Sequence, residues 1–329
     1  MEKECTVSSE STWRSYIVDL YESFKILVKL LLIFLLCFNC SQTDYTRLLN
    51  LKSDLNDSVA VVPNVTRTRI FCLIFTNDYG NDYIAIHGHA TWIKNCDRYL
   101  FVSNEVHAVL EPLLVKYRDR WDTLKVSLFH VHQYYAADLD WLLIVNDNNY
   151  VVLENLRKLL KPYSPDEPIN FGCKMKDTDN QTYMRGGIVL SHEALRRLVV
   201  EGFTNASLCR ANDTPYATEE MGKCLKNLGV VDGDSRDAMG RQRFIPFPPE
   251  DYLANLSPEV EEWFAKRSFY EINATTRQLS PEVISFSDVS PSTMVTLHYY
   301  IYKLRIFGRK VLPQAQNVTN HLENDTLLS

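Results

Sequence analysis

The chain has 329 residues, of which 46% are hydrophobic, and this suits one large domain with a substantial core and short appendages. Its net charge of −6 and the scattered positions of its basic residues argue against a nucleic-acid-binding protein, which needs a basic surface. Eight Cys in a chain of this size are ordinary for a secreted domain, and their number alone assigns no compartment.

The N-terminal region predicts a membrane anchor. Residues 26–38 (ILVKLLLIFLLCF) are almost wholly apolar, and Lys29 lies one turn from the end of the run, where it can reach the headgroups. The run is short for an average bilayer but suits a thinner early-secretory membrane. A cleaved signal peptide and a buried helix are the alternatives, although Asn39-Cys40-Ser41 is a poor cleavage site. We therefore expect a cytosolic tail at 1–25 and a transmembrane signal anchor at 26–40.

Glycosylation signals predict that the rest of the chain lies in the secretory lumen. Asn-x-Ser/Thr triplets are more frequent than the composition alone would produce, and they begin at Asn56, Asn64, Asn180, Asn205, Asn212, Asn255, Asn273, Asn317 and Asn324. In that oxidising compartment, paired cysteines are expected to form disulfides. Residues 41–66 are polar and lack an apolar period, which indicates a stem.

A folded domain is expected over residues 67–310, followed by a polar tail at 311–329. Residues 70–75 (IFCLIF) predict a strand buried on both faces, a helix is expected around 83–94, and a short strand is expected at 99–102. Residues 120–136 carry an apolar stripe at helical spacing, formed by Trp121, Leu124, Leu128, Val131 and Tyr135.

The alternation of elements continues and predicts an α/β sheet with parallel strands. A buried strand begins at residue 140 and ends at Asn146-Asp147-Asn148, and a helix follows at 153–160. Further strands are expected at 169–171 and 184–190, and Ser191 caps a helix over 192–200. Pro246, Pro248 and Pro249 mark a loop, and residues 297–307 form a final, mostly apolar element.

The polar cluster at the end of the strand is the most informative feature of the chain. Carboxylates at such a position hold the divalent cation through which many sugar transferases bind the diphosphate of a nucleotide sugar. Here two of the three candidates, Asn146 and Asn148, are amides, which can ligate a cation but bring no charge, and only Asp147 is acidic. Ordinary turn chemistry is the alternative.

Other motifs are weaker when taken singly. The pair Gly186-Gly187 permits close approach of a ligand or of another backbone, and Arg236 lies in a polar loop where it could bind phosphate or pair with its acidic neighbours. Glu219 and Glu220 fall in an expected helix and are candidate general bases, although exposed helical glutamates are commoner. The histidine pairs are interpreted as structural, because residues two apart on a helix face different directions; they are His87, His89, His130 and His132.

Ordered motifs extend from about residue 68 to residue 309. They are Arg69-Ile70-Phe71-Cys72, Ala90-Thr91-Trp92, Cys96-Asp97, Asp140-Trp141, Glu154-Asn155-Leu156-Arg157, residues 165–172 (PDEPINFG), Tyr183-Met184, Leu190-Ser191-x-Glu193-Ala194-Leu195, residues 233–241 (GDSRDAMGR), Ser292-Thr293-Met294 and Tyr302-x-Leu304-Arg305. Together they resemble the core-1 β1,3-galactosyltransferase family, whose members extend GalNAc-Ser/Thr on O-glycoproteins.

The resemblance implies a single-pass type II protein of the Golgi or endoplasmic reticulum membrane. It implies one nucleotide-sugar domain of the A type, with a mostly parallel sheet flanked by helices, which uses UDP-galactose and Mn²⁺ and commonly forms homodimers. Cys72 and Cys96 are the members of one implied disulfide, and Cys209 and Cys224 are the members of the other. The donor contacts that it implies are Trp141, Asn146, Asp147, Asn148, Gly186, Gly187 and Arg236.

Departures from the family pattern fall at the positions that carry chemistry. Amides replace two acids of the family's Asp triplet, and Ser287 stands where the family has a metal-binding His. The family's acidic pair aligns with Ala217-Thr218, so that Glu219 and Glu220 reach its place only through a shift of two residues. The Cys pair expected before Ser280 is Gln278-Leu279. The shortened glycine loop is similar to that of the family's chaperone-like branch, whereas residues 233–241 are similar to the enzymes.

These residues leave three functions open. The first is a pseudo-glycosyltransferase that binds an active core-1 synthase or an O-glycoprotein client, because an enzyme that loses both the charged metal ligands and the general base should lose most of its activity. The second is a working β1,3-galactosyltransferase in which Asp147 contacts metal or ribose and Glu219 or Glu220 is the base. The third is a lectin-like binder of O-glycans.

Overall fold

The computed structural model describes residues 68–76, 82–116, 120–254 and 256–307. The expected cytosolic tail, anchor, stem and polar tail lie outside these residues, as do the sequons at Asn56, Asn64, Asn255, Asn317 and Asn324. Within the described part of the chain, no helix combines the length and apolar character needed to cross a membrane.

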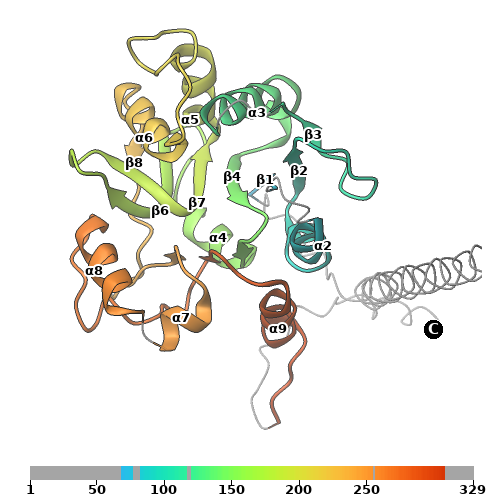
Figure 1. Ribbon diagram of the computed structural model, residues 1–329, viewed down its shortest axis with the longest axis vertical. Coiled ribbons are helices and arrows are strands. Elements are labelled where there is room, and N and C mark those ends of the chain that lie inside the picture. The colour runs from blue at the N-terminus through green and yellow to red at the C-terminus, as the bar shows by residue number, and fades with distance from the viewer. Residues whose placement is uncertain (1–67, 77–81, 117–119, 255, 308–329) are drawn as a thin grey trace, which may run out of the picture. The chain divides into compact units, whose positions relative to one another are not determined.

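A seven-stranded sheet lies at the centre of the described domain (Figure 1). In sheet order, its strands are β3 (Leu113–Leu114), β2 (Arg98–Ser103), β1 (Ile70–Phe75), β4 (Trp141–Asn146), β7 (Thr182–Ser191), β6 (Ile169–Lys176) and β8 (Val231–Asp232). The first four strands of this order are parallel, β7 is antiparallel to both of its neighbours, and β6 is parallel to β8. The predicted α/β class with a mostly parallel sheet is therefore confirmed, and β7 is the strand that departs from it.

Helices cover both faces of the sheet (Figure 1). Phe71 and Leu73 of β1 pack toward the helices α3, α5 and α6, whereas Ile70, Cys72 and Ile74 pack on the opposite face, because side chains alternate along a strand. The helices are α2 (Asp82–Ala90), α3 (Arg120–Tyr135), α4 (Leu153–Leu160), α5 (His192–Arg196), α6 (Ala217–Asn227), α7 (Pro249–Ala254), α8 (Pro258–Arg267) and α9 (Pro291–Tyr302). Burial of both faces explains why β1 and β4 are continuous apolar runs.

A second sheet of three short strands holds distant parts of the chain together. Its order is β5 (Tyr150–Val151), β10 (Ser285–Phe286) and β9 (Phe244–Ile245), with β10 antiparallel to β5 and parallel to β9. The Ser285 hydroxyl donates a hydrogen bond to the Gly186 carbonyl of β7. This sheet therefore fixes the residues that follow β10 beside the residues that follow β4.

Several expected elements differ from the structure at their ends. The helix expected at 83–94 is α2 followed by a separate 3₁₀ turn, η1 (Ile93–Asn95), and a further 3₁₀ turn, η2 (Ala136–Asp138), follows α3. The Ser191 hydroxyl caps α5 by accepting from the Ala194 N–H at 3.0 Å, and the helix continues in a wider π geometry as η3 (Arg197–Gly202). Pro249 begins α7 rather than extending the expected loop, and α9 begins at Pro291, before the expected residue 297.

Two disulfides connect the elements around the sheet. Cys72 of β1 is bonded to Cys96, and Cys209 is bonded to Cys224 of α6, which confirms both implied pairings. Cross-links that close loops of this size stabilise a domain by about 3 kcal/mol each in the chain-entropy account. Cys173 is buried and outside any disulfide within the described residues.

Candidate active site

A cavity of about 610 Å³ opens where the C-terminal end of β4 meets the middle of β7. The carboxyl ends of parallel strands form the edge at which open α/β sheets bind ligands. The lining residues come from five segments and are Arg120, Ile144, Val145, Asn146, Asn148, Asn149, Met184, Arg185, Gly186, Gly187, Ile188, Pro215, Tyr216, Thr218, Glu219, Ser287 and Asp288.

The asparagines after β4 form a turn that is clamped to the segment after β10. The Asn149 side chain accepts from the Asn146 N–H at 3.1 Å and donates to the Ser287 hydroxyl at 2.9 Å. Beside it, the Asn148 amide donates to the Asp288 carboxylate at 2.9 Å. The backbone of these polar residues therefore forms a turn, as the alternative interpretation predicted. The same turn also forms one wall of the cavity.

Asp147 lies elsewhere. Its side chain is fully buried, its N–H donates to the Phe75 carbonyl at 2.9 Å, and it does not line the cavity. The structure thus brings Asn146, Asn148 and Ser287 into the cavity wall and separates from them the remaining acid of the triplet.

The donor set of this wall does not fit a Mn²⁺ ion held in the manner of the family. Manganese and similar hard cations favour charged oxygen ligands, and the acidic side chains that line the cavity, among the described residues, are Glu219 and Asp288, neither of which stands at a position of the family's Asp triplet or metal-binding His. No group of three or more His, Cys, Asp or Glu side chains in the described part of the chain could hold a metal. The Asn148 N–H donor also points at the Asp288 carboxylate, where a cation would have to compete with it.

Gly186 and Gly187 give β7 a backbone course that other residues would not adopt. Their φ angles are +73° and +111°, in the region that favours glycine. A Cβ atom at Gly186 would lie 3.3 Å from the Phe244 backbone, and one at Gly187 would lie 3.4 Å from Val145. The pair therefore lets β7 bend across the end of β4 and leaves the cavity open.

Helix α6 brings Glu219 to the cavity. Glu219 lies in the first turn and accepts from the Thr218 hydroxyl at 3.1 Å, whereas Glu220, on the same turn, does not line the cavity. Gly222 lets α6 pack directly on β7, since a Cβ there would lie 2.3 Å from the Thr182 carbonyl oxygen. Of the two candidate bases, Glu219 is the one that the fold brings to the cavity.

Arg236 and Trp141 are outside this cavity. The Arg236 guanidinium bonds to the Asp234 carboxylate at 3.0 and 2.8 Å and lies 3.4 Å from the centre of the Tyr270 ring, so the loop is internally paired. Trp141 begins β4 at the opposite end of the strand, where it packs on Phe171 and lines a separate cavity of about 560 Å³.

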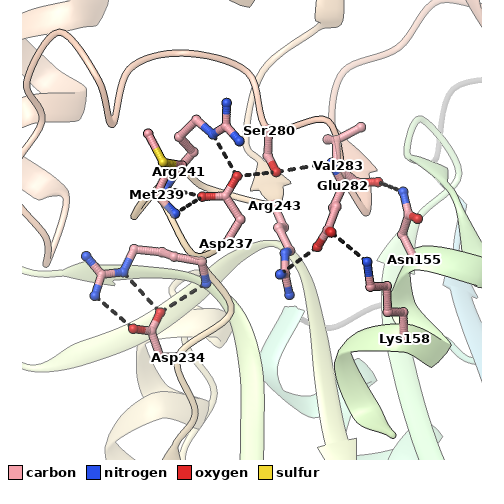
Figure 2. Close-up of polar contacts among 11 residues, drawn as sticks. Asn155, Lys158, Asp234, Asp237, Met239, Arg241, Arg243, Ser280, Glu282 and Val283 are labelled. Atoms are coloured by element: carbon pink, nitrogen blue, oxygen red, sulfur yellow. Dashed lines mark hydrogen bonds and ion pairs between the residues drawn. The ribbon is translucent and has the colours of Figure 1, made fainter.

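A polar network fixes the loop that leads from Arg236 into β9. The Asp237 carboxylate accepts from Ser280 and Arg241, each at 2.7 Å, and Glu282 pairs with Arg243 and Lys158 (Figure 2). Burial alone would raise the pKa of Asp237, but the hydrogen bonds from Ser280 and Arg241 outweigh burial and lower this pKa to about 2. The network anchors the short sheet that supports the cavity wall.

The histidine pairs have ordinary contacts. A ring nitrogen of His87 bonds to the Tyr83 carbonyl at 2.6 Å, and a ring nitrogen of His89 bonds to the Tyr99 hydroxyl at 2.9 Å. His130 packs against Tyr134. Burial lowers the pKa of both His130 and His132, which keeps their neutral forms favoured.

Sequence reasoning missed several polar cavity residues, among them Arg120, Arg185, Tyr216 and Asp288. Arg185 immediately precedes the glycine pair, and Asp288 immediately follows Ser287, so proximity to motifs was an available signal for both. Arg120 begins the helix that was expected at 120–136, but nothing local indicates that this end of the helix faces β4.

Comparison with known proteins identifies the relatives of this fold. A family model described as Fringe-like matches residues 115–230, which contain α3, β4, the Asn146–Asn149 turn, the glycine pair and α6. Glycoprotein-N-acetylgalactosamine 3-beta-galactosyltransferase 1 of Xenopus laevis is 34% identical over 275 residues, which cover 79% of this chain and 75% of the relative.

Other relatives match a shorter part of the sequence or resemble the chain in structure. Beta-1,3-glucosyltransferase of Mus musculus is 33% identical over 140 residues, which are 41% of this chain and 26% of the relative. The human beta-1,3-glucosyltransferase is 33% identical over 125 residues, which are 36% of this chain and 23% of the relative. A crystal structure of the galactosyltransferase LgtC with donor and acceptor sugar analogs aligns at 13% identity and a TM-score of 0.36, over 71% of this chain and 97% of that chain. Because the Xenopus relative matches more than three quarters of the sequence, the chain belongs to the core-1 β1,3-galactosyltransferase family.

Proposed function

We propose that this protein is a secretory-pathway member of the family that retains the nucleotide-sugar cavity, has weakened or lost galactosyl transfer, and acts as a chaperone or partner. Its partner would be an active core-1 synthase, bound in a heterodimer, or an O-glycoprotein client. The observation that carries the proposal is the wall of the cavity. Neutral side chains, Asn146, Asn148 and Ser287, stand at the family's cation-binding positions, and Asp147 is buried away from them.

The chemical consequence is that the negative charge of the UDP leaving group is poorly stabilised. When the bond between the anomeric carbon and the diphosphate breaks, negative charge grows on UDP, and a bound cation stabilises that charge by several kcal/mol in metal-dependent transferases. Among the residues that the structure describes, only the carboxylates of Glu219 and Asp288 line the cavity, and no group of three or more acidic, His or Cys side chains could hold such a cation. Transfer of galactose should therefore be slow, while binding of donor or acceptor can persist.

A type II topology in the Golgi or endoplasmic reticulum membrane completes the proposal. It is supported by the apolar run at 26–38 and by the sequons, because the four sequon asparagines that the structure describes are all exposed; they are Asn180, Asn205, Asn212 and Asn273. Exposure is what an oligosaccharide attached at these positions requires.

Active transfer is the second candidate, and the position of Glu219 favours it. In that reaction the Glu219 carboxylate takes the proton of the acceptor hydroxyl, the hydroxyl oxygen bonds to the anomeric carbon of galactose, and UDP leaves from the opposite face with inversion. Glu220 could not serve in this way because it does not line the cavity. Removal of a general base lowers rates by roughly 10²–10⁴-fold.

A transfer assay separates the two candidates. The purified full-length protein, in detergent, is incubated with UDP-galactose and a GalNAc-threonine acceptor, with and without Mn²⁺. We expect no transfer above background from folded protein. Transfer that Glu219→Gln abolishes and Glu220→Gln leaves intact would establish the enzyme instead.

The partner role has its own measurement. Tagged protein co-expressed with an active core-1 synthase should retain the synthase through purification in detergent. Recovery of the tagged protein only as a free monomer or self-dimer would count against the role of partner to the synthase.

A further inference from the structure

Two arginines from different elements line the same cavity. Arg120 is the first residue of α3, and Arg185 lies on β7 next to Gly186. Both side chains are exposed, and the Arg185 guanidinium is 5.3 Å from the centre of the Trp263 ring. These positions give the cavity two permanent positive charges.

Within the described residues, neither arginine takes part in an ion pair, in contrast to Arg196, Arg236 and Arg241, which pair with carboxylates. The acids of the cavity have other hydrogen-bond donors, since Asp288 accepts from the Asn148 amide and Glu219 accepts from the Thr218 hydroxyl. The Arg120 guanidinium, and those donors of the Arg185 guanidinium that do not bond to the Tyr183 hydroxyl, therefore remain available for an anion in the cavity.

The amides and the arginines complement each other. Carboxylates at positions 146 and 148 would repel a diphosphate until a cation bound between them, whereas Asn146 and Asn148 bring no such charge. A guanidinium carries a permanent charge and bonds phosphate oxygens in pairs, so it can neutralise a diphosphate without a metal. The loss of the cation ligands and the presence of two guanidiniums outside ion pairs, among the described residues, thus favour the same ligand.

We infer that Arg120 and Arg185 bind the diphosphate of the nucleotide sugar directly, in place of a divalent cation. The inference rests on the proposed function in one respect, namely that this cavity is the nucleotide-sugar site. It goes beyond that function by assigning the phosphate contacts and by making nucleotide binding independent of metal.

Calorimetric titration of UDP into the full-length protein in detergent tests the inference. Binding should be equal in EDTA and in Mn²⁺, and it should weaken as salt is raised, because the contacts are ionic. Arg120→Gln and Arg185→Gln should each weaken binding about 10-fold to 100-fold, as expected for the loss of a charge-assisted hydrogen bond. Arg305→Gln, which removes an exposed arginine outside the cavity, should leave the affinity unchanged.

Three results would overturn the inference. If UDP binds only in Mn²⁺, a divalent cation holds the diphosphate after all. If UDP binds in EDTA and both cavity substitutions leave its affinity unchanged, the diphosphate binds to residues other than Arg120 and Arg185. No binding of UDP in either buffer would reject the nucleotide site itself, while the partner role would still be decided by co-purification with the synthase. Arg120→Lys and Arg185→Lys, which keep the charge but lose the paired donors, should bind with intermediate affinity, and unfolding temperatures equal to wild type establish that all variants are folded.

Discussion

Gly186 is required for two reasons, its positive φ angle and the lack of space for a Cβ atom beside Phe244. Its φ of +73° is close to the +70° of Gly229, but a Cβ at Gly186 would lie 3.3 Å from backbone atoms of Phe244. A Cβ at Gly229 would meet only the flexible end of the Arg197 side chain, at 3.6 Å. An alanine at Gly229 would therefore lose stability from backbone strain alone, whereas an alanine at Gly186 would also crowd the cavity wall.

Substitution at these positions gives a matched pair. Gly229→Ala should lower the free energy of unfolding by about 1 kcal/mol, from backbone strain alone. Gly186→Ala should lower it by about 3 kcal/mol, because backbone strain and displacement of β9 add together. Thermal unfolding at one scan rate measures both, and titration with UDP should be impaired only for Gly186→Ala. Equal losses of stability would contradict the packing argument.

At the scale of elements, a network of charged side chains around the short sheet supports its position. Asp237 joins the loop before β9 to Ser280 and Arg241, and Glu282 joins Arg243 of the same segment to Lys158 of α4 (Figure 2). The Asp237 side chain is only 5% exposed, so its ion pair with Arg241 is little screened by solvent. These contacts support β9 and β10, and through β10 they support the wall that contains Ser287 and Asp288.

The lowered pKa of Asp237 makes this support dependent on pH. An aspartate has a pKa of about 3.9 in the unfolded chain, whereas that of Asp237 is about 2 in the folded protein. Its contribution, about 2 kcal/mol, is therefore complete above pH about 4 and is lost as the pH falls toward 2. Asp237→Asn should lower the free energy of urea unfolding near neutral pH and should change it little near pH 2.

The control for this prediction is Glu262→Gln. It removes a carboxylate that pairs with Lys266 on the exposed surface of α8, and the pH dependence of unfolding should change much less than for Asp237→Asn. If the curves of the Asp237 variant and the wild type stay parallel through the acid range, the Asp237 network has no such role.

For the molecule as a whole, disulfides and sequons point to the same compartment. Two disulfides and four exposed sequon asparagines lie within the described domain, and disulfides persist in oxidising compartments. Neither feature depends on the chemistry of the cavity, so the proposed lumenal location can be tested separately from activity.

Expression of the full chain in animal cells tests this location. Digestion with peptide N-glycosidase should increase its electrophoretic mobility, because N-linked oligosaccharides are added only to sequons that enter the secretory lumen. The mobility shift should shrink by one glycan for each single substitution by Gln at Asn180, Asn205, Asn212 or Asn273. Asn104→Gln, at an exposed asparagine outside any sequon, should leave the shift unchanged. Mobility unaffected by the enzyme would contradict a lumenal domain.

Much of the fold follows from local sequence, because the signals for strands and helices are themselves local. The apolar run at residues 70–75 is β1, the helix expected at 153–160 is α4, and Ser191 caps α5 through a bond to a residue three positions away. Element ends were less accurate, as at α9, where Ser290 and Pro291 start the helix six residues before the apolar stretch begins. The ordered motifs likewise indicate the family, and the resemblance predicts both disulfides.

The composition of the cavity was decided by tertiary structure. Asn148 meets Asp288 and Asn149 meets Ser287 across nearly half of the chain, and Arg120 reaches the end of β4 only because α3 packs on the sheet. The direction of a side chain at the end of a strand is equally non-local, so Asp147 is buried while Asn146 and Asn148 face the cavity. By itself, the sequence determined the class, the family and the residue types available for chemistry. Only the packing of distant segments determined which of them meet, because such contacts depend on loop closure and burial rather than on spacing along the chain.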